Sequence, residues 1–133
     1  MKVERVIIHT DGASRGNPGP AAIGATVKNE EGKLLARISR PIGITTNNEA
    51  EYRAAIVALE EAISLGATQV NLVLDSQLVA RQISGQYRVK KASLKPLYHR
   101  LKQLQSLLKG FTITHISREQ NTEADNLANM ALR

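Results

Sequence analysis

Apolar and polar residues alternate along the first third of the chain in the manner of β-strands. Segments rich in β-branched and other apolar residues predict three strands, over 3–11, 21–28 and 33–41. Three glycines and two prolines predict a loop over 12–20, and a short turn is expected at 29–32. Strands joined by such short connections predict an antiparallel meander.

The pattern changes to helical spacing after the third strand. Apolar residues three and four positions apart, together with glycine stops, predict helices over four segments, 47–65, 76–83, 94–108 and 122–132. Apolar runs at 69–75 and 111–117 predict two further strands. The resulting element order predicts an α/β fold in which a mixed sheet packs against helices, within a single domain over 1–133.

Composition narrows the class of protein. Apolar residues make up 42% of 133 residues, which is enough for one core, and no apolar run approaches the length of a membrane span. The chain has no cysteine, which excludes disulfides, thiolate zinc sites and cysteine nucleophiles. We therefore expect a cytoplasmic protein, without contact to a membrane, and a monomer because no feature indicates an oligomer.

The charge balance favours a polyanionic partner. Lys and Arg number 18 against 12 Asp and Glu, for a net charge of +6 and a pI of about 9.9. Nucleic acid is the partner that such a charge indicates. The alternative is a basic protein with no specific partner, since net charge alone speaks for association and not for activity.

Four acidic residues stand out against this basic background. Asp11, Glu51, Asp75 and Asp125 lie at or near predicted strand or helix ends. Three of them have ordinary structural alternatives. Asp11 can serve in a turn, Asp75 can cap a helix, and Asp125 can pair with Thr122 in a capping box or complement the helix dipole.

Glu51 lacks such an alternative. Thr46 and Glu49 have the spacing of a capping box, so the structural task at the helix start is already filled. The residues three and four positions after Glu51 are alanines, which excludes a helical salt bridge. We expect Glu51 to face inward, where a carboxylate needs a partner or a metal ion.

Carboxylates gathered at one edge of a sheet repel one another unless a cation lies between them. Hard oxygen ligands, in a chain with no cysteine and no obvious histidine cluster, suit Mg²⁺ or Mn²⁺ better than zinc. The sequence thus predicts a divalent-cation site on a protein that binds a polyanion.

Four phrases carry a resemblance to a known family. They are TDGASRGNPGPA at 10–21, TTNNEAEYRAAIVALE at 45–60, LDSQLVARQI at 74–83 and REQNTEADNLA at 118–128. Across essentially its whole length the chain resembles type 1 ribonuclease H, whose catalytic carboxylates follow the chain order Asp, Glu, Asp, Asp. The resemblance implies the ribonuclease H-like fold, a five-stranded mixed sheet with helices on both faces.

The resemblance also implies an activity. Asp11, Glu51, Asp75 and Asp125 would bind two Mg²⁺ ions, with Mn²⁺ as a substitute, and hydrolyse the RNA strand of an RNA–DNA hybrid to 5′-phosphate and 3′-hydroxyl ends. Two alternatives stay open, a binding module without catalysis and a nuclease that acts on double-stranded RNA.

Substrate contacts follow from the same resemblance. It places Asn17, Asn47 and Gln77 at the minor groove of the hybrid, and Arg15 and Thr46 at phosphates. The alternatives are a turn role for Asn17 and a helix cap for Thr46.

The chain departs from the family pattern in two places. Many members carry a mobile histidine before the last Asp. Here His115 falls on a predicted strand, and Arg118 lies nearer to that loop, as in a short-loop subgroup of the family. The segment between Gly85 and Leu94 lacks the inserted helix and basic loop that some members use to hold the DNA strand.

Overall fold

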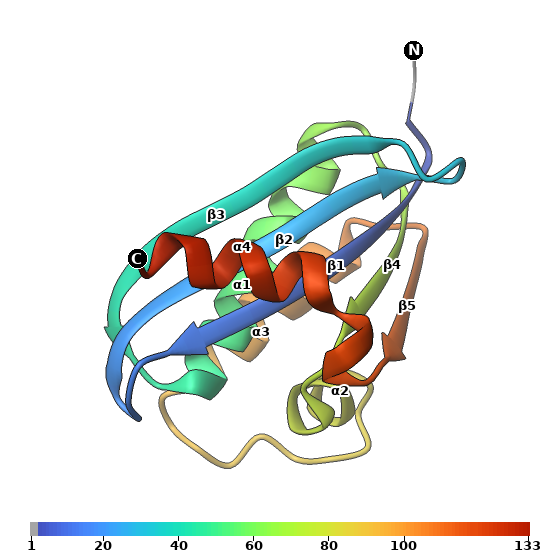
Figure 1. Cartoon of the computed structure of the whole chain (residues 1–133). Helices are drawn as coiled ribbons and strands as arrows, with labels where there is room; N and C mark the ends of the chain where they lie inside the picture. The colour runs from blue at the N-terminus through green and yellow to red at the C-terminus, as the bar shows by residue number, and fades with distance from the viewer. Residues whose placement is uncertain (1–2) are drawn as a thin grey trace.

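A computed structural model, which describes residues 3–133, contains one five-stranded mixed sheet (Figure 1). The strands are β1 (Arg5–Ser14), β2 (Gly19–Asn29), β3 (Leu34–Thr45), β4 (Gln69–Leu74) and β5 (Gly110–His115). Their order in the sheet is β3-β2-β1-β4-β5, so β1 is the central strand.

The first three strands form the predicted antiparallel meander, and β4 and β5 run parallel to β1. Thr10 of β1 pairs with Leu74 of β4, so the residues that follow them, Asp11 and Asp75, lie at the same edge of the sheet. This parallel register brings together two segments more than sixty positions apart.

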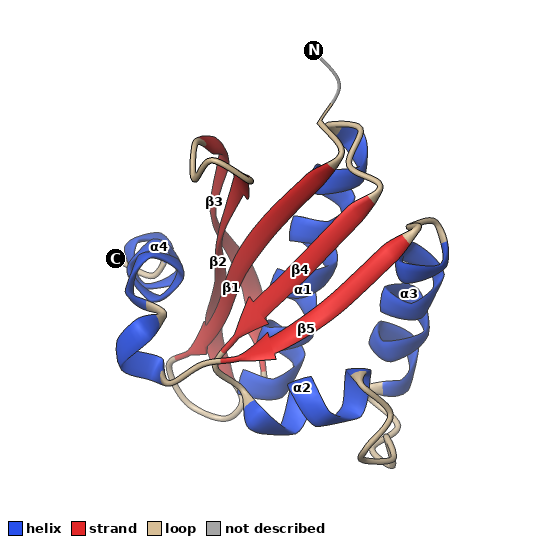
Figure 2. Cartoon of the chain, turned by 90° about the vertical axis from the view of Figure 1, so that its right-hand side faces the viewer, coloured by secondary structure: helices blue, strands red, loops and turns tan. Residues whose placement is uncertain are grey.

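Helices cover both faces of the sheet, as Figure 2 shows. The elements are α1 (Asn47–Ser64), α2 (Gln77–Ile83), α3 (Lys95–Ser106), the 3₁₀ turn η1 (Arg118–Gln120) and α4 (Thr122–Ala131). One face is covered by α1 and α3, the other by α4 over β1, β2 and β3, and α2 lies near the carboxyl end of β4. Within residues 3–133, no helix is long and apolar enough to span a membrane.

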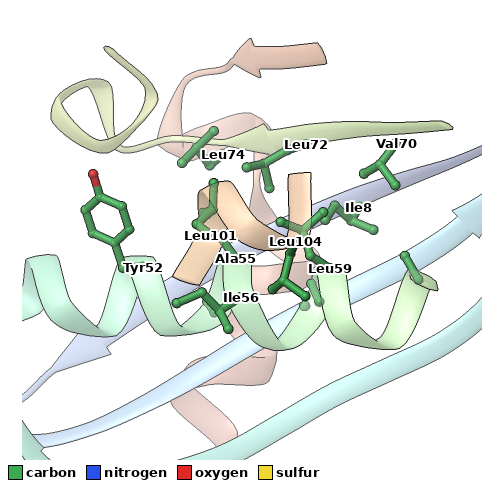
Figure 3. Close-up of a cluster of buried hydrophobic side chains, with 14 of the residues drawn as sticks. Ile8, Tyr52, Ala55, Ile56, Leu59, Val70, Leu72, Leu74, Leu101 and Leu104 are labelled. Atoms are coloured by element: carbon green, nitrogen blue, oxygen red, sulfur yellow. The ribbon is translucent and has the colours of Figure 1, made fainter. Parts of the chain in front are cut away.

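The core lies between the sheet and the pair α1 and α3 (Figure 3). It is aliphatic, with Ile8, Leu59, Leu72 and Leu101 fully buried. Tyr52 brings a hydroxyl group into this core, and the hydroxyl donates a 2.7 Å hydrogen bond to the buried Gln82. This core fixes α1 against the central strands, and with it the position of Glu51.

Two glycines let helices approach the sheet closely. A Cβ on Gly12 would lie 2.3 Å from the backbone carbon of Ala50 in α1, and a Cβ on Gly24 would lie 2.2 Å from the carbonyl oxygen of Ala124 in α4. Both distances are far below van der Waals contact, so only glycine fits at either position. The starts of α1 and α4 can therefore lie directly against the two faces of the sheet.

The loop between the first two strands is shorter at both ends than the predicted segment 12–20. β1 continues to Ser14, which pairs with Ala21, and β2 begins at Gly19, which pairs with Thr45 of β3. Tertiary pairing overrides local turn preference here.

Other boundaries differ from the predictions by smaller amounts. β3 runs to Thr45, past the predicted end at residue 41, and the pairing register shifts beside Pro41 at this outer strand. α3 ends at Ser106, before the predicted stop, and Gly110 is the first residue of β5.

Candidate active site

Three carboxylates converge at the carboxyl ends of β1 and β4. Asp11, Glu51 and Asp75 each offer an oxygen, and these oxygens all lie within 4.8 Å of one another. Asp11 lies inside β1 and pairs with Gly24, so the turn role considered for it is excluded. The predicted convergence of Asp11 and Asp75 is confirmed.

Asp11 is buried, with 5% of its surface exposed. Burial raises the pKa of its carboxyl from 3.8 to about 7, and the nearby charges of Asp75 and Asp125 act in the same direction. In the absence of a cation the cluster therefore holds a proton at a pH where an ordinary aspartate has lost it.

Glu51 faces inward from the first turns of α1 and is 3% exposed. Its Oε1 accepts a 3.1 Å hydrogen bond from the backbone N–H of Gly12. Among the described residues its Oε2 has no hydrogen-bond partner. Burial, followed by the charge of Asp11, raises the pKa of Glu51 well above its usual value. A buried, unsatisfied acceptor beside two other carboxylates has the properties of a cation ligand.

The start of α1 forms the predicted capping box. Thr46 is the N-cap, and its hydroxyl accepts from the N–H of Glu49 while the Glu49 carboxylate accepts from the N–H of Thr46. The capping role of Glu49 is confirmed, which leaves Glu51, two positions later, directed into the cluster. The helix-cap alternative for Thr46 is likewise confirmed.

Helix caps do not account for the two remaining aspartates. Ser76 caps α2 by accepting from the N–H of Val79 at 3.2 Å, so Asp75 is not the cap. Asn121 is the N-cap residue of α4, so the alternative in which Thr122 and Asp125 form a capping box is wrong. Asp125 lies one turn into α4, and its Oδ1 is 3.8 Å from the guanidinium of Arg118.

The four acidic side chains Asp11, Glu51, Asp75 and Asp125 line one open cavity of about 290 Å³. Asp125 belongs to this lining but not to the group of three carboxylates within 4.8 Å. The predicted site residues that line the cavity are Asp11, Glu51, Asp75, Asp125, Arg15, Asn47 and Arg118. The cavity therefore contains acidic residues at its base with basic residues among its walls.

Other predicted contact residues lie around this cavity. The side-chain oxygen of Asn17 accepts a 3.1 Å hydrogen bond from the N–H of Asn47, which joins the loop after β1 to the start of α1. Gln77 is exposed at the start of α2 and lines a separate hollow with His115.

His115 is the last residue of β5, as expected for a strand residue. Its Nε2 is 3.2 Å from the backbone oxygen of Asp75. The ring thus contacts the backbone of Asp75, and it does not line the acidic cavity.

Comparisons with known proteins agree with this geometry. The family model described as reverse transcriptase-like matches residues 9–131. A ribonuclease HI of Halobacterium salinarum is 43% identical over 128 residues, which cover 96% of this chain and 64% of that protein. The crystal structure of RNase H1 from this archaeon superposes with a TM-score of 0.94 and covers 96% of this chain and 97% of that one. The chain belongs to the ribonuclease H family.

Two further members of the family have solved structures. The N-terminal RNase H domain of a Mycobacterium tuberculosis protein is 43% identical, with a TM-score of 0.94 over 97% of this chain and 99% of that one. An RNase H1 isolated from compost, solved in complex with an RNA/DNA hybrid, is 41% identical, with a TM-score of 0.90 over 95% of each chain.

The lengths of these relatives differ from that of the chain. The chain spans 35% of the mycobacterial bifunctional protein and 64% of the archaeal ribonuclease HI.

One polar residue at this ribonuclease H site was missed by the sequence reasoning. Asn121 is 1% exposed, and its side-chain amide donates to both the backbone oxygen of Thr10 and the Oδ2 of Asp75. The only signal in the sequence was its position directly before a predicted helix, which is typical of a cap and does not indicate contact with a carboxylate.

Proposed function

We propose that the chain is a metal-dependent endonuclease that hydrolyses the RNA strand of RNA–DNA hybrids and leaves 5′-phosphate and 3′-hydroxyl ends. The observation that carries the proposal is the group of three carboxylates within 4.8 Å, two of them buried, on a chain with a net charge of +6. A protein that only bound nucleic acid would gain nothing from this repulsion beside its ligand. The RNase H1 isolated from compost, which was solved in complex with an RNA/DNA hybrid, supports the choice of substrate.

The residues fit a divalent cation. The ligand set consists of carboxylate oxygens, which Mg²⁺ and Mn²⁺ prefer, and the Oε2 of Glu51 lacks a partner among the described residues. The pKa of Asp11 is raised first by burial and then by the charges of Asp75 and Asp125, and a cation would offset both effects. We propose two Mg²⁺ ions, with Mn²⁺ as a substitute, held by Asp11, Glu51, Asp75 and Asp125.

Each carboxylate has its own support from the fold. Asp11 comes from the central strand and would be one of the residues that hold the ions. Glu51 is held by the Gly12 N–H, and Asp75 by the amide of Asn121. Asp125 stands nearer to solvent, beside Arg118. When bound, the ions would supply activation of the attacking water and stabilisation of the departing 3′ oxygen.

The polar rim supports recognition of a hybrid duplex. The wide minor groove of an A-like duplex exposes 2′-hydroxyls, which distinguish RNA from DNA. The bonded pair Asn17 and Asn47 lies next to the cavity, and we propose that both, with Gln77, contact this groove. Arg15 and Arg118 line the cavity, where they would contact phosphates. Thr46 is proposed at a phosphate as well, although its hydroxyl already serves the capping box.

The decisive experiment measures cleavage of matched RNA–DNA, RNA–RNA and DNA–DNA duplexes with Mg²⁺, with Mn²⁺ and with chelator. We expect cleavage of the RNA strand of the hybrid only when a divalent ion is present. Asp75→Asn is nearly isosteric and removes one ligand charge, and we expect a loss of about 100-fold or more. Glu31→Gln, on the exposed turn between β2 and β3, removes the same charge away from the site and serves as the matched control.

The outcomes separate the competing functions. Cleavage with chelator present, or full activity of Asp75→Asn, would contradict the metal mechanism. Binding of the hybrid without cleavage under any condition would favour a binding module, and cleavage of RNA–RNA would extend the substrate to double-stranded RNA.

We also propose that residues 1–133 act as one domain and as a monomer in the cytoplasm. The single sheet and shared core support the first point, and the absence of cysteine supports the last. Size-exclusion chromatography with light scattering tests the monomer.

A further inference from the structure

Asn121 connects three segments that meet at the acidic cluster. It lies between η1 and α4 and is 1% exposed. Its Nδ2 donates a 2.9 Å hydrogen bond to the backbone oxygen of Thr10, in β1, and another of 2.9 Å to Oδ2 of Asp75, directly after β4. Its own backbone oxygen accepts from the N–H of Asp125 at 3.1 Å, within the first turn of α4.

Position 121 faces two acceptors and therefore favours a neutral side chain that can donate two N–H hydrogen bonds. Both partners, a peptide carbonyl and a carboxylate, are acceptors only. A carboxylate at position 121 would place acceptor against acceptor, and an aliphatic side chain would remove the donor to both the Thr10 carbonyl and the Asp75 carboxylate. A primary amide satisfies both acceptors and adds no charge to the cluster. Since only its nitrogen can donate, the orientation of the amide follows from its neighbours.

We propose that Asn121 is a positioning residue that holds the Asp75 carboxylate in the orientation in which it binds a divalent cation. The proposal rests on the metal site of the proposed function. The amide occupies one oxygen of Asp75 and leaves the other for the cation. Its second bond, to Thr10, ties that orientation to the strand that carries Asp11. Partners of this kind, which hold a ligand without touching the metal, contribute 10- to 100-fold in affinity in other metalloproteins.

The test is a double-mutant cycle on Mn²⁺ affinity, measured by isothermal titration calorimetry without nucleic acid. We expect Asn121→Ala to weaken Mn²⁺ binding by about 10-fold. In the Asp75→Ala background, where there is no carboxylate to position, Asn121→Ala should change the affinity by less than about 2-fold. An equal loss in both backgrounds, or no loss in the wild-type background, would overturn the proposal.

Two further variants separate positioning from folding. Asn121→Ser keeps a donor and should recover part of the affinity if Asn121→Ala is too unstable to measure. Asn126→Ala changes an exposed asparagine of the same helix and should leave Mn²⁺ affinity within about 2-fold of wild type. A serine variant that folds and yet binds Mn²⁺ no better than the alanine variant would count against a donor role.

Kinetic measurements can distinguish weaker metal binding from a general loss of activity. The Mg²⁺ concentration for half-maximal cleavage should rise in Asn121→Ala while KM for the hybrid stays near the wild-type value. A rise in KM alone would assign Asn121 to substrate binding and overturn the proposal. If wild type binds Mn²⁺ but cleaves no hybrid, the proposed function fails while the cycle still decides the role of Asn121. If wild type binds no Mn²⁺, both fail.

Discussion

Asp11 and Gly24 are direct partners across β1 and β2, and Gly24 lies beneath the first turns of α4. The residue that faces Asp11 on the neighbouring strand is therefore the one that lets α4 reach the sheet. This relationship brings Asp125 and Asn121 to the cluster that contains Asp11.

Gly24→Ala should disrupt this approach. Its Cβ would lie 2.2 Å from the carbonyl oxygen of Ala124 and 2.4 Å from the amide nitrogen of Ala128, so α4 must shift. We expect a loss of about 2–3 kcal/mol in unfolding free energy, measured by chemical denaturation, together with weaker cleavage. Gly110→Ala is the matched control, because its Cβ would approach only the flexible side chain of Gln69, at 3.3 Å. Equal stability of the two variants would contradict this account.

Glu51→Gln should separate stability from activity. The change removes a buried carboxyl whose ionisation is disfavoured by burial and by Asp11, and the new amide can donate toward Asp11. In chelator we expect the variant to be more stable than wild type by about 1 kcal/mol. The rise in melting temperature that Mn²⁺ gives wild type should be lost, and cleavage should fall by about 100-fold. Scanning calorimetry with and without Mn²⁺ checks the first two points, and a variant that is destabilised in chelator would refute the argument.

The stability of the metal-free protein should fall as pH rises from about 4 to about 7. The folded protein holds the Asp11 proton up to a pKa of about 7, whereas the ordinary value is 3.8, so the folded state binds more protons in this window. The slope from Asp11 should be about 1 kcal/mol per pH unit. Denaturation in chelator at several pH values measures it. Asp11→Asn should make the fall in stability with pH less steep. Saturating Mg²⁺ should also reduce the slope, because the cation replaces the proton. If the slope is unchanged in Asp11→Asn, the assignment to Asp11 is wrong.

Thr46→Ala decides between a helix cap and a phosphate contact. Its hydroxyl accepts the Glu49 N–H, so we expect a loss of about 1 kcal/mol in unfolding free energy. If the cap is its whole role, KM for the hybrid stays unchanged at a temperature where the variant is folded. A rise in KM by several-fold, with normal stability, would instead assign it to the substrate.

Arg118→Ala tests the exposed cation beside Asp125. Its side chain is 81% exposed and its ion pair with Asp125 is 3.8 Å long, so the pair contributes little stability. We expect weaker hybrid binding and a salt dependence of log Kd that is shallower by about one unit of slope. Lys33 lies directly before β3, away from the cavity. Lys33→Ala also removes one positive charge and should leave the slope unchanged. An unaltered slope in Arg118→Ala would exclude a phosphate contact.

The sequence predicted the elements well where periodicity was strong, as in α1 and in the apolar run of β4. It also identified Glu51, because the neighbouring Glu49 already filled the capping position. The ends of β1 and β2 were missed because glycines that indicate a turn can equally well pair in a ladder. Asn121 was missed because its partner Thr10 lies 111 positions away, and no local pattern reports that contact.

The acidic cavity is lined by residues from position 11 to position 132, so no short fragment of the chain contains it. A growing or truncated polypeptide that lacks α4 would present Asp11 without Asp125 and without the amide that holds Asp75. Binding of a divalent ion would then strengthen when the last helix docks. The increase in Mn²⁺ binding during refolding would report when that final step takes place. Unfolding of α4 alone would weaken binding of the ion while the sheet stays intact.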